Sequence, residues 1–332
     1  MPHKPVALLI LWAALSWAQA PQLLPDPYGH PIDNWAQMPA GRTLGLASGL
    51  AFDREGNLWI LDRCGANSCA GINLDPVLEF DPSGRFLRSF GAGLFVFPHQ
   101  IFIDNDGSVW TTDADGKDGI GHTVVKFSPE GRVLMTLGKQ GVAGSGPDTF
   151  NRPSGVVVAA DGDIFVADGH GGNSSERVVK FSRDGKFIKA WGKKGSAPGE
   201  FDGLHGIAID SRGRVLVADR DNNRIQIFDQ DGGFLDQWLQ FSRPSALFID
   251  KNDTLFVPDN TSGVTRPGWP RGIRIGDAKD GKVTGFVPFP DLDRQRDPKS
   301  TAHGVENAVV DAEGSIYVVD VDRKMVKKFL KK

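Results

Sequence analysis

A motif that recurs six times constrains the fold of this chain more than any other feature. Its clearest copy is GLHGIAIDSRGRVLVADRDNNRIQIFDQDGG, from Gly203 to Gly233. Short runs of alternating apolar residues are separated by turns rich in Gly and Asp, which is typical of an antiparallel β-meander. A single repeat unit of this size cannot bury its own apolar faces, so neighbouring copies must pack together.

Aligning the chain on the turn glycine of this motif recovers the other copies. The turn positions are Gly56, Gly107, Gly162, Gly213 and Gly314, with Asp253 at the equivalent place in a sixth copy. Six four-stranded units arranged radially leave only short, protected sheet edges. The sequence therefore predicts an all-β fold, a six-bladed β-propeller that occupies residues 41–332.

The N-terminal forty residues form two segments. Residues 1–20 have a basic start at Lys4, an apolar run and the end Ala18-Gln19-Ala20, which is typical of a secretory signal peptide. A buried N-terminal strand or helix is the alternative. We expect the mature protein to be secreted or periplasmic, with no membrane span, because no other apolar stretch is long enough to cross a bilayer.

Residues 21–40 are rich in proline and are expected to wrap the rim before the first blade. The last copy of the motif shows only three strands before the chain ends at Lys332. The sequence predicts that the segment from Trp35 to Leu46 supplies the missing outer strand and closes the ring, because closure removes two exposed sheet edges.

Composition excludes some classes of partner. Hydrophobic residues make up 40% and charged residues 24% of the chain, and the 41 glycines and 21 prolines suit a turn-rich β protein. The net charge is -3, with both signs spread along the chain. Nucleic acid is not expected as a partner, because binding phosphates needs a concentrated basic surface. We expect a monomer that takes a small molecule or a peptide at its rim.

Two cysteines, Cys64 and Cys69, lie in one loop with the sequence RCGANSC. In a secreted chain such an isolated pair is expected to form a local disulfide, which would stiffen the loop that begins at Arg63. Half of a zinc site is the alternative, and it would need two further ligands nearby.

The residue eight positions before each turn glycine lies at the mouth of the innermost strand. The series is Ser48, His99, Ser154, His205, Ser245 and Glu306. Alternate blades of a six-bladed ring are about 120° apart, so two imidazoles and a carboxylate would converge on the axis, a set that binds catalytic zinc.

We therefore predict a metal site at His99, His205 and Glu306, with zinc or another divalent transition metal, and with His303 as the rival third ligand. Occupancy should fall as the pH drops through roughly 6, where free imidazole gains its proton. Polar residues that merely line a wet channel are the alternative.

The loops that follow the second strand of each blade lie on the same rim, and they differ in length between blades. Two residues there are candidates to act on a substrate: Arg63 as a fixed positive charge and His170 as a base near neutral pH. The aspartate that ends each second strand occurs in every copy, so we expect it to stabilise turns. These residues are Asp62, Asp113, Asp168, Asp219, Asp259 and Asp320.

The segment VADRDNNRIQIFDQDG resembles the NHL repeat. The combination of ILDRCG, FPHQIFID, FVADGHGGN and GLHGIAID is similar to peptidyl-α-hydroxyglycine α-amidating lyase. That resemblance implies a six-bladed propeller with zinc held by three histidines, a catalytic Arg and Tyr, and a structural calcium in the channel. It also implies cleavage of a carbinolamide to a peptide amide and glyoxylate. Two zinc histidines fall on His99 and His205, and the catalytic Arg falls on Arg63.

Other positions of the family pattern depart from it. The third zinc histidine falls on Glu306, the catalytic Tyr on His170, and a channel Met on Gly304. Backbone carbonyls of the calcium site fall on Leu50 and Ile101, but its aspartate falls on Asn307. Three functions follow as hypotheses: a metal-dependent lyase of the amidating type, a related propeller hydrolase such as a lactonase, and a non-catalytic scaffold that binds a protein or glycan.

Overall fold

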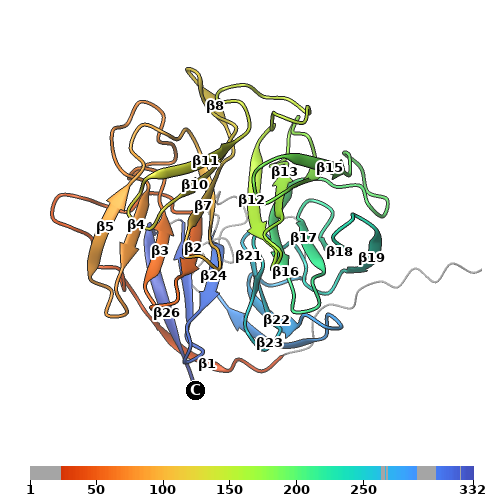
Figure 1. The fold of residues 1–332 in the computed structure, drawn as a ribbon. Coiled ribbons are helices and arrows are strands. Elements are labelled where there is room, and N and C mark those ends of the chain that lie inside the picture. Colours follow the sequence, from red (N-terminus) through yellow and green to blue (C-terminus); the bar gives the residue numbers. More distant parts are fainter. Residues whose placement is uncertain (1–23, 263–265, 267, 290–303, 322) are drawn as a thin grey trace, which may run out of the picture.

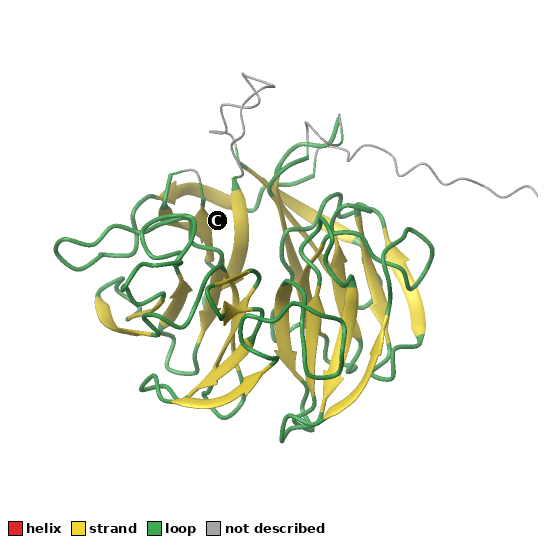
Figure 2. Cartoon of the chain, turned by 90° about the horizontal axis from the view of Figure 1, so that it is seen from above, coloured by secondary structure: helices red, strands yellow, loops and turns green. Residues whose placement is uncertain are grey.

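The computed structural model describes residues 24–262, 266, 268–289, 304–321 and 323–332. Within these ranges the chain is all-β, and Figure 2 shows strands joined by loops with no helix. The described part of the chain accordingly offers no helix with the length and hydropathy that a membrane span requires. The predicted signal peptide at residues 1–20 and the rival ligand His303 lie outside the described residues.

Six four-stranded antiparallel sheets form the blades, and Figure 1 shows them around a common centre. The strands of blades one to three are β2 (Gly49–Phe52), β3 (Leu58–Leu61), β4 (Val77–Phe80), β5 (Phe86–Phe90); β6 (Pro98–Ile103), β7 (Val109–Asp113), β10 (Val124–Phe127), β11 (Val133–Leu137); β12 (Pro153–Val158), β13 (Ile164–Asp168), β14 (Arg177–Phe181), β15 (Phe187–Trp191). Those of blades four to six are β16 (Leu204–Ile209), β17 (Val215–Asp219), β18 (Arg224–Phe228), β19 (Phe234–Trp238); β20 (Phe248–Ile249), β21 (Thr254–Asp259), β22 (Gly272–Asp277), β23 (Val283–Pro288); β24 (Val305–Val310), β25 (Ile316–Asp320), β26 (Met325–Lys331), β1 (Tyr28–Ile32). A two-stranded hairpin, β8 (Gly116–Lys117) with β9 (Ile120–Gly121), extends from blade two. The predicted six-bladed propeller is confirmed.

Ring closure differs from the sequence prediction. The outer strand of blade six is β1, which pairs antiparallel with β26. In Figure 1 these strands carry the colours of the N-terminal and C-terminal ends of the chain, red and blue. The prediction that Trp35 to Leu46 forms this strand was wrong, and the strand lies in the segment assigned to the rim. Its sequence, YGHPI, is short and contains Pro31, which an outermost strand tolerates because one of its edges needs no hydrogen-bond donors. Trp35 still joins the closure, because its backbone N–H donates to the carbonyl oxygen of Val326 at 3.0 Å.

The turn between the first and second strands has the same backbone conformation in every blade. The residues at the motif's glycine position have φ between 61° and 95°. In blade five this residue is Asp253, with φ of 61°, a left-handed conformation that aspartate tolerates better than most side chains. The sixth copy of the motif is therefore a true blade despite lacking the glycine.

Six hydrophobic clusters hold the ring together, and each one lies between two neighbouring blades. Leu50 and Ile60 of blade one, for example, share a cluster with Val309 and Tyr317 of blade six. The ring of Trp35 packs edge-on against Tyr317 with centroids 4.9 Å apart, so the N-terminal segment covers the seam where the ring closes. Apolar burial between blades is therefore the main force that fixes the central channel.

The aspartates that end the second strands bind the segments that lead into the inner strands. Asp62 accepts a hydrogen bond from the backbone N–H of Gly45 at 2.6 Å, and Asp168 accepts one from Asn151 at 2.7 Å. Asp62 also accepts a hydrogen bond of 2.9 Å from the backbone N–H of Gly65, which is the turn-stabilising role that the sequence predicts. These contacts also tie the rim loops to the mouth of each inner strand.

Candidate metal centre

The inner strands of blades two, four and six bring three predicted ligands to one point. His99 of β6 and His205 of β16 have ring centroids 4.6 Å apart, and both side chains are buried. Oε1 of Glu306, from β24, lies 3.3 Å from Nε2 of His205 and 3.8 Å from Nε2 of His99. In a tetrahedral zinc site with bonds of 2.0–2.1 Å, ligand atoms lie roughly 3.3 Å apart, so these separations suit a shared ion.

The serines of the intervening blades orient the two imidazoles. Nδ1 of His99 lies 2.7 Å from the carbonyl oxygen of Ser154, and Nδ1 of His205 lies 2.5 Å from that of Ser245. A carbonyl can only accept, so each Nδ1 carries the proton and each Nε2 keeps its lone pair. Fixing the tautomer through a carbonyl is the usual way in which a protein prepares a metal-binding histidine. Both Nε2 atoms are buried and have no hydrogen-bond partner among the described residues.

Glu306 is held by an amide from the preceding blade, blade five. Its Oε2 accepts a hydrogen bond from Nδ2 of Asn260, a buried residue that follows β21. This contact leaves Oε1 facing the lone pairs of two imidazoles. Three acceptor atoms that face one another repel unless a cation or a proton lies between them, which is why this donor set fits a metal ion.

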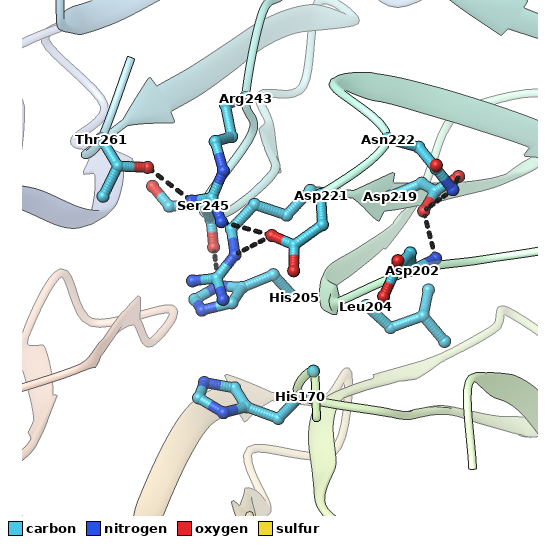
Figure 3. Close-up of polar contacts among 12 residues, drawn as sticks. His170, Asp202, Leu204, His205, Asp219, Asp221, Asn222, Arg243, Ser245 and Thr261 are labelled. Atoms are coloured by element: carbon cyan, nitrogen blue, oxygen red, sulfur yellow. Dashed lines mark hydrogen bonds and ion pairs between the residues drawn. The ribbon is translucent and has the colours of Figure 1, made fainter. Parts of the chain in front are cut away.

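His170 joins the same cluster from the loop after β13. Its ring centroid is 4.4 Å from that of His99 and 5.0 Å from that of His205. Figure 3 shows the side chains of His170 and His205. One ring nitrogen from each of the three histidines lies within 4.8 Å of the others. Sequence reasoning placed His170 in the site only as a base, whereas the structure also puts it within reach of an ion.

The environment of His170 differs from that of the other two histidines. Its Nδ1 is buried without a hydrogen-bond partner among the described residues, and its ring packs edge-on against Phe97 with centroids 5.8 Å apart. A ring that no carbonyl fixes is free to exchange a proton. This difference separates two oriented imidazoles, His99 and His205, from one that can act as a base.

Burial keeps all three imidazoles neutral. Loss of solvation, reinforced by the charge of Arg63, lowers the pKa of His99 to about 3. Burial is also the main cause that holds the pKa values of His170 and His205 well below the ordinary value. Neutral imidazole is the form that binds metal, so no proton has to be released at neutral pH.

Arg63 follows β3 and is fixed on three sides. Its Nε donates to the carbonyl oxygen of Pro98 at 3.2 Å, and its guanidinium carbon lies 3.8 Å from the ring centroid of Phe97. Its Nη1 donates to Oδ1 of Asn67 at 3.0 Å. Asn67 lies inside the loop that the disulfide between Cys64 and Cys69 closes, so the predicted pairing is confirmed and the clamped loop holds the arginine directly. Burial lowers the pKa of Arg63 to about 10, which leaves it cationic at neutral pH.

Arg220 is a site residue that sequence reasoning missed. It follows Asp219 at the end of β17 as Arg63 follows Asp62 at the end of β3, and this repeated position was the signal that could have found it. Its charge acts on the pKa of His205 and His170, and its own pKa is lowered to about 10, mainly by burial. Its buried Nε lies 3.6 Å from Oδ1 of Asp221, too far for a hydrogen bond.

Asp221 forms this ion pair with Arg220 and is also bound by Arg243. Figure 3 shows Arg243 in contact with both Asp221 and Thr261. The carboxylate beside Arg220 is therefore shared between two arginines.

The channel behind the metal centre contains the three residues expected to bind calcium. Leu50, Ile101 and Asn307 line a cavity of about 210 Å³. The described wall of this cavity contains no Asp or Glu, and its polar residues are Gln100 and Asn307. Ca²⁺ sites in proteins draw on carboxylate oxygens, so the side chains present here do not fit that ion.

Comparison with known proteins agrees with the fold. The NHL repeat family matches residues 150–181 and 201–228. NHL repeat-containing protein 3 of Homo sapiens is 39% identical over 174 residues, which are 51% of this chain and 48% of that protein. A probable peptidyl-α-hydroxyglycine α-amidating lyase of Caenorhabditis elegans is 32% identical over 205 residues, covering 56% of each protein.

The chain thus spans about half the length of these curated relatives. Among solved structures, a gluconolactonase of Xanthomonas campestris superposes with a TM-score of 0.61 at 16% identity and covers 92% of this chain and 99% of that one. That likeness concerns the fold alone. The chain contains NHL repeats in a six-bladed propeller, and it is similar to the amidating lyases.

Proposed function

We propose that this chain is a metal-dependent lyase of the peptidyl-α-hydroxyglycine α-amidating type, which cleaves a carbinolamide at the channel mouth. The observation that carries the proposal is the convergence of three buried acceptor atoms, Nε2 of His99, Nε2 of His205 and Oε1 of Glu306. Relatives named as lyases of this type support the reaction class.

His99, His205 and Glu306 would hold the metal, with zinc as the first choice for two imidazoles and a carboxylate. When bound, the ion supplies Lewis acidity that lowers the pKa of a substrate hydroxyl group. Glu306 makes the centre less positive than three neutral histidines would. The guanidinium groups of Arg63 and Arg220 add positive charge next to it.

His170 takes the proton of the substrate hydroxyl group as general base. The electron pair of the O–H bond forms the carbonyl of the leaving aldehyde, and the C–N bond breaks. The amide nitrogen leaves with the electron pair of the broken C–N bond and receives the proton from His170, which gives a primary amide and glyoxylate. Arg63 binds the carboxylate of the glyoxylate half, because a fixed guanidinium suits a planar anion.

The disulfide fits a place outside the reducing cytoplasm. We therefore retain a secreted or periplasmic location as part of the proposal. A substrate that carries a carboxylate and a peptide or acyl group would reach the site from the rim, where the loops after the second strands lie.

The test is glyoxylate release from an N-acyl-α-hydroxyglycine by protein purified without chelator and assayed for metal. One equivalent of a transition metal and stereospecific glyoxylate formation are expected. His99→Ala should abolish both, whereas His30→Ala, an exposed histidine on β1, should change neither. Protein that contains no transition metal and takes none up, or metal-loaded protein that hydrolyses lactones but forms no glyoxylate, would overturn the proposal.

A further inference from the structure

The residue after His99 connects two blades. Oε1 of Gln100 accepts a hydrogen bond of 2.8 Å from the backbone N–H of Val156 in β12. The backbone N–H of Gln100 itself donates to Oγ1 of Thr112 at 3.0 Å within blade two. Val156 is fully buried, so its N–H depends on this side chain for a partner.

The packing around this contact makes room for the amide. A Cβ atom on Gly155 would lie 2.5 Å from Oε1 of Gln100, so any larger residue there would displace the amide from its present position. A Cβ atom on Gly49 would lie 2.8 Å from the backbone nitrogen of Ile101. Glycine at both positions therefore lets the inner strands approach closely in the layer directly behind the metal centre. At Gly155 the missing side chain also leaves space for the amide of Gln100.

This layer is neutral. Gln100 and Asn307 are the polar residues of the described cavity wall, and apolar side chains such as Ile101 and Ile207 surround them. A divalent cation transferred from water into such surroundings loses hydration that two amides and backbone carbonyls replace poorly. Arg63 and Arg220 add unfavourable positive charge at the neighbouring mouth of the channel.

We propose that the side-chain amide of Gln100 takes the place of a channel cation in this protein: it joins blades two and three, and the channel binds no Ca²⁺. The lyase resemblance implies calcium at Leu50, Ile101 and Asn307, and the neutral wall of this cavity is unsuited to that ion. The proposal does not use the lyase reaction, so the catalytic assay can fail while this inference holds.

The first arm of the test is thermal unfolding of the full chain in EGTA and in millimolar CaCl₂. Wild-type protein should have the same Tm in both and should contain no calcium by elemental analysis. A calcium-dependent rise in the Tm of wild-type protein, or stoichiometric calcium after purification, would overturn the proposal. Asn307→Asp restores the carboxylate and is expected to make Tm rise with calcium, whereas the exposed Asn73→Asp should not.

The second arm tests the amide itself. Gln100→Leu keeps the volume but removes the acceptor, so the N–H of Val156 is left buried and unpaired. A fall in Tm on the order of 5 °C, equal in EGTA and in calcium, is expected. The matched change Gln140→Leu, at an exposed position, should leave Tm unaltered. If Gln100→Leu unfolds at the wild-type temperature, the amide does not join the blades and the proposal fails.

Discussion

Nδ1 of His205 lies 2.5 Å from the carbonyl oxygen of Ser245, on the inner strand segment of the next blade. The same relationship links His99 to Ser154. Each ring is thus oriented by the neighbouring blade, so the geometry of the metal centre depends on how adjacent blades pack. This contact explains the alternation of histidine and serine from blade two to blade five, and in each case the serine contributes its backbone carbonyl.

Removal of either oriented imidazole should empty the centre without unfolding the ring. His99→Ala or His205→Ala deletes one of three ligands, and the blades are held by separate apolar clusters. Metal content by elemental analysis should fall by most of its value, while the circular dichroism spectrum stays that of the parent. Full retention of metal in both variants would mean that the mouth is a polar channel.

Asn260 should tune the affinity for metal through Glu306. Asn260→Ala frees Oε2 of Glu306 and lets the carboxylate move, and loss of such a partner typically weakens metal binding about 10–100-fold. A competition titration with a chromogenic chelator measures the change. Glu306→Gln should weaken binding further, because it removes the negative charge. His303→Ala serves as the comparison, since loss of metal there and not at Glu306 would reassign the third ligand.

His170 should affect turnover more than metal content. Nδ1 of its ring has no hydrogen-bond partner among the described residues, and the proposed role is proton transfer, which typically contributes about 10²–10⁴ in rate. His170→Ala should therefore keep the metal and lower kcat within that range, with KM little changed. Loss of one metal equivalent in this variant would make His170 a ligand instead of the base.

The metal-free protein should lose stability in acid, starting near the unfolded-state pKa of histidine. The folded pKa of His99 is about 3, and those of His170 and His205 also lie well below the ordinary value. The unfolded chain therefore binds more protons than the folded chain at pH values below roughly 6.5. Stability is full above that pH and declines as the pH falls toward the folded values.

Tm measured across pH 4 to 7 in EDTA checks this decline. His205→Ala should flatten the profile, and a profile in the variant as steep as in the parent would contradict the assignment. For the same reason, the loaded protein should keep its metal below the pH of roughly 6 that an unperturbed histidine predicts.

The disulfide should act on Arg63 more than on the fold. Cys64→Ser with Cys69→Ser releases the loop that contains Asn67, the partner of Nη1 of Arg63. A loop this short contributes little to stability, so Tm should change by only a few degrees. KM for a carboxylate substrate should rise several-fold, and Asn67→Ala should reproduce the rise with the disulfide intact. An unchanged KM in both variants would separate the loop from substrate binding.

Local pattern alone determined the six blades and the identity of three residues at the channel mouth. Period-two apolar runs and turns at fixed spacing specify each sheet, because strand pairing within a blade joins neighbouring segments. Counting back from the turn then located His99, His205 and Glu306, and the presence of two cysteines in one short loop predicted the disulfide between Cys64 and Cys69. Each of these inferences depends on residues close together in the chain.

Contacts between distant segments were decided only in the tertiary structure. The strand that closes the ring is Tyr28–Ile32. Several N-terminal segments had a weak strand pattern, and which of them pairs with β26 depends on contacts between the two ends of the chain. The carbonyls of Ser154 and Ser245 and the approach of His170 and Arg220 likewise depend on how blades face one another. The packing of neighbouring blades sets the direction in which a side chain at the rim points. The spacing of residues along one strand does not determine that direction.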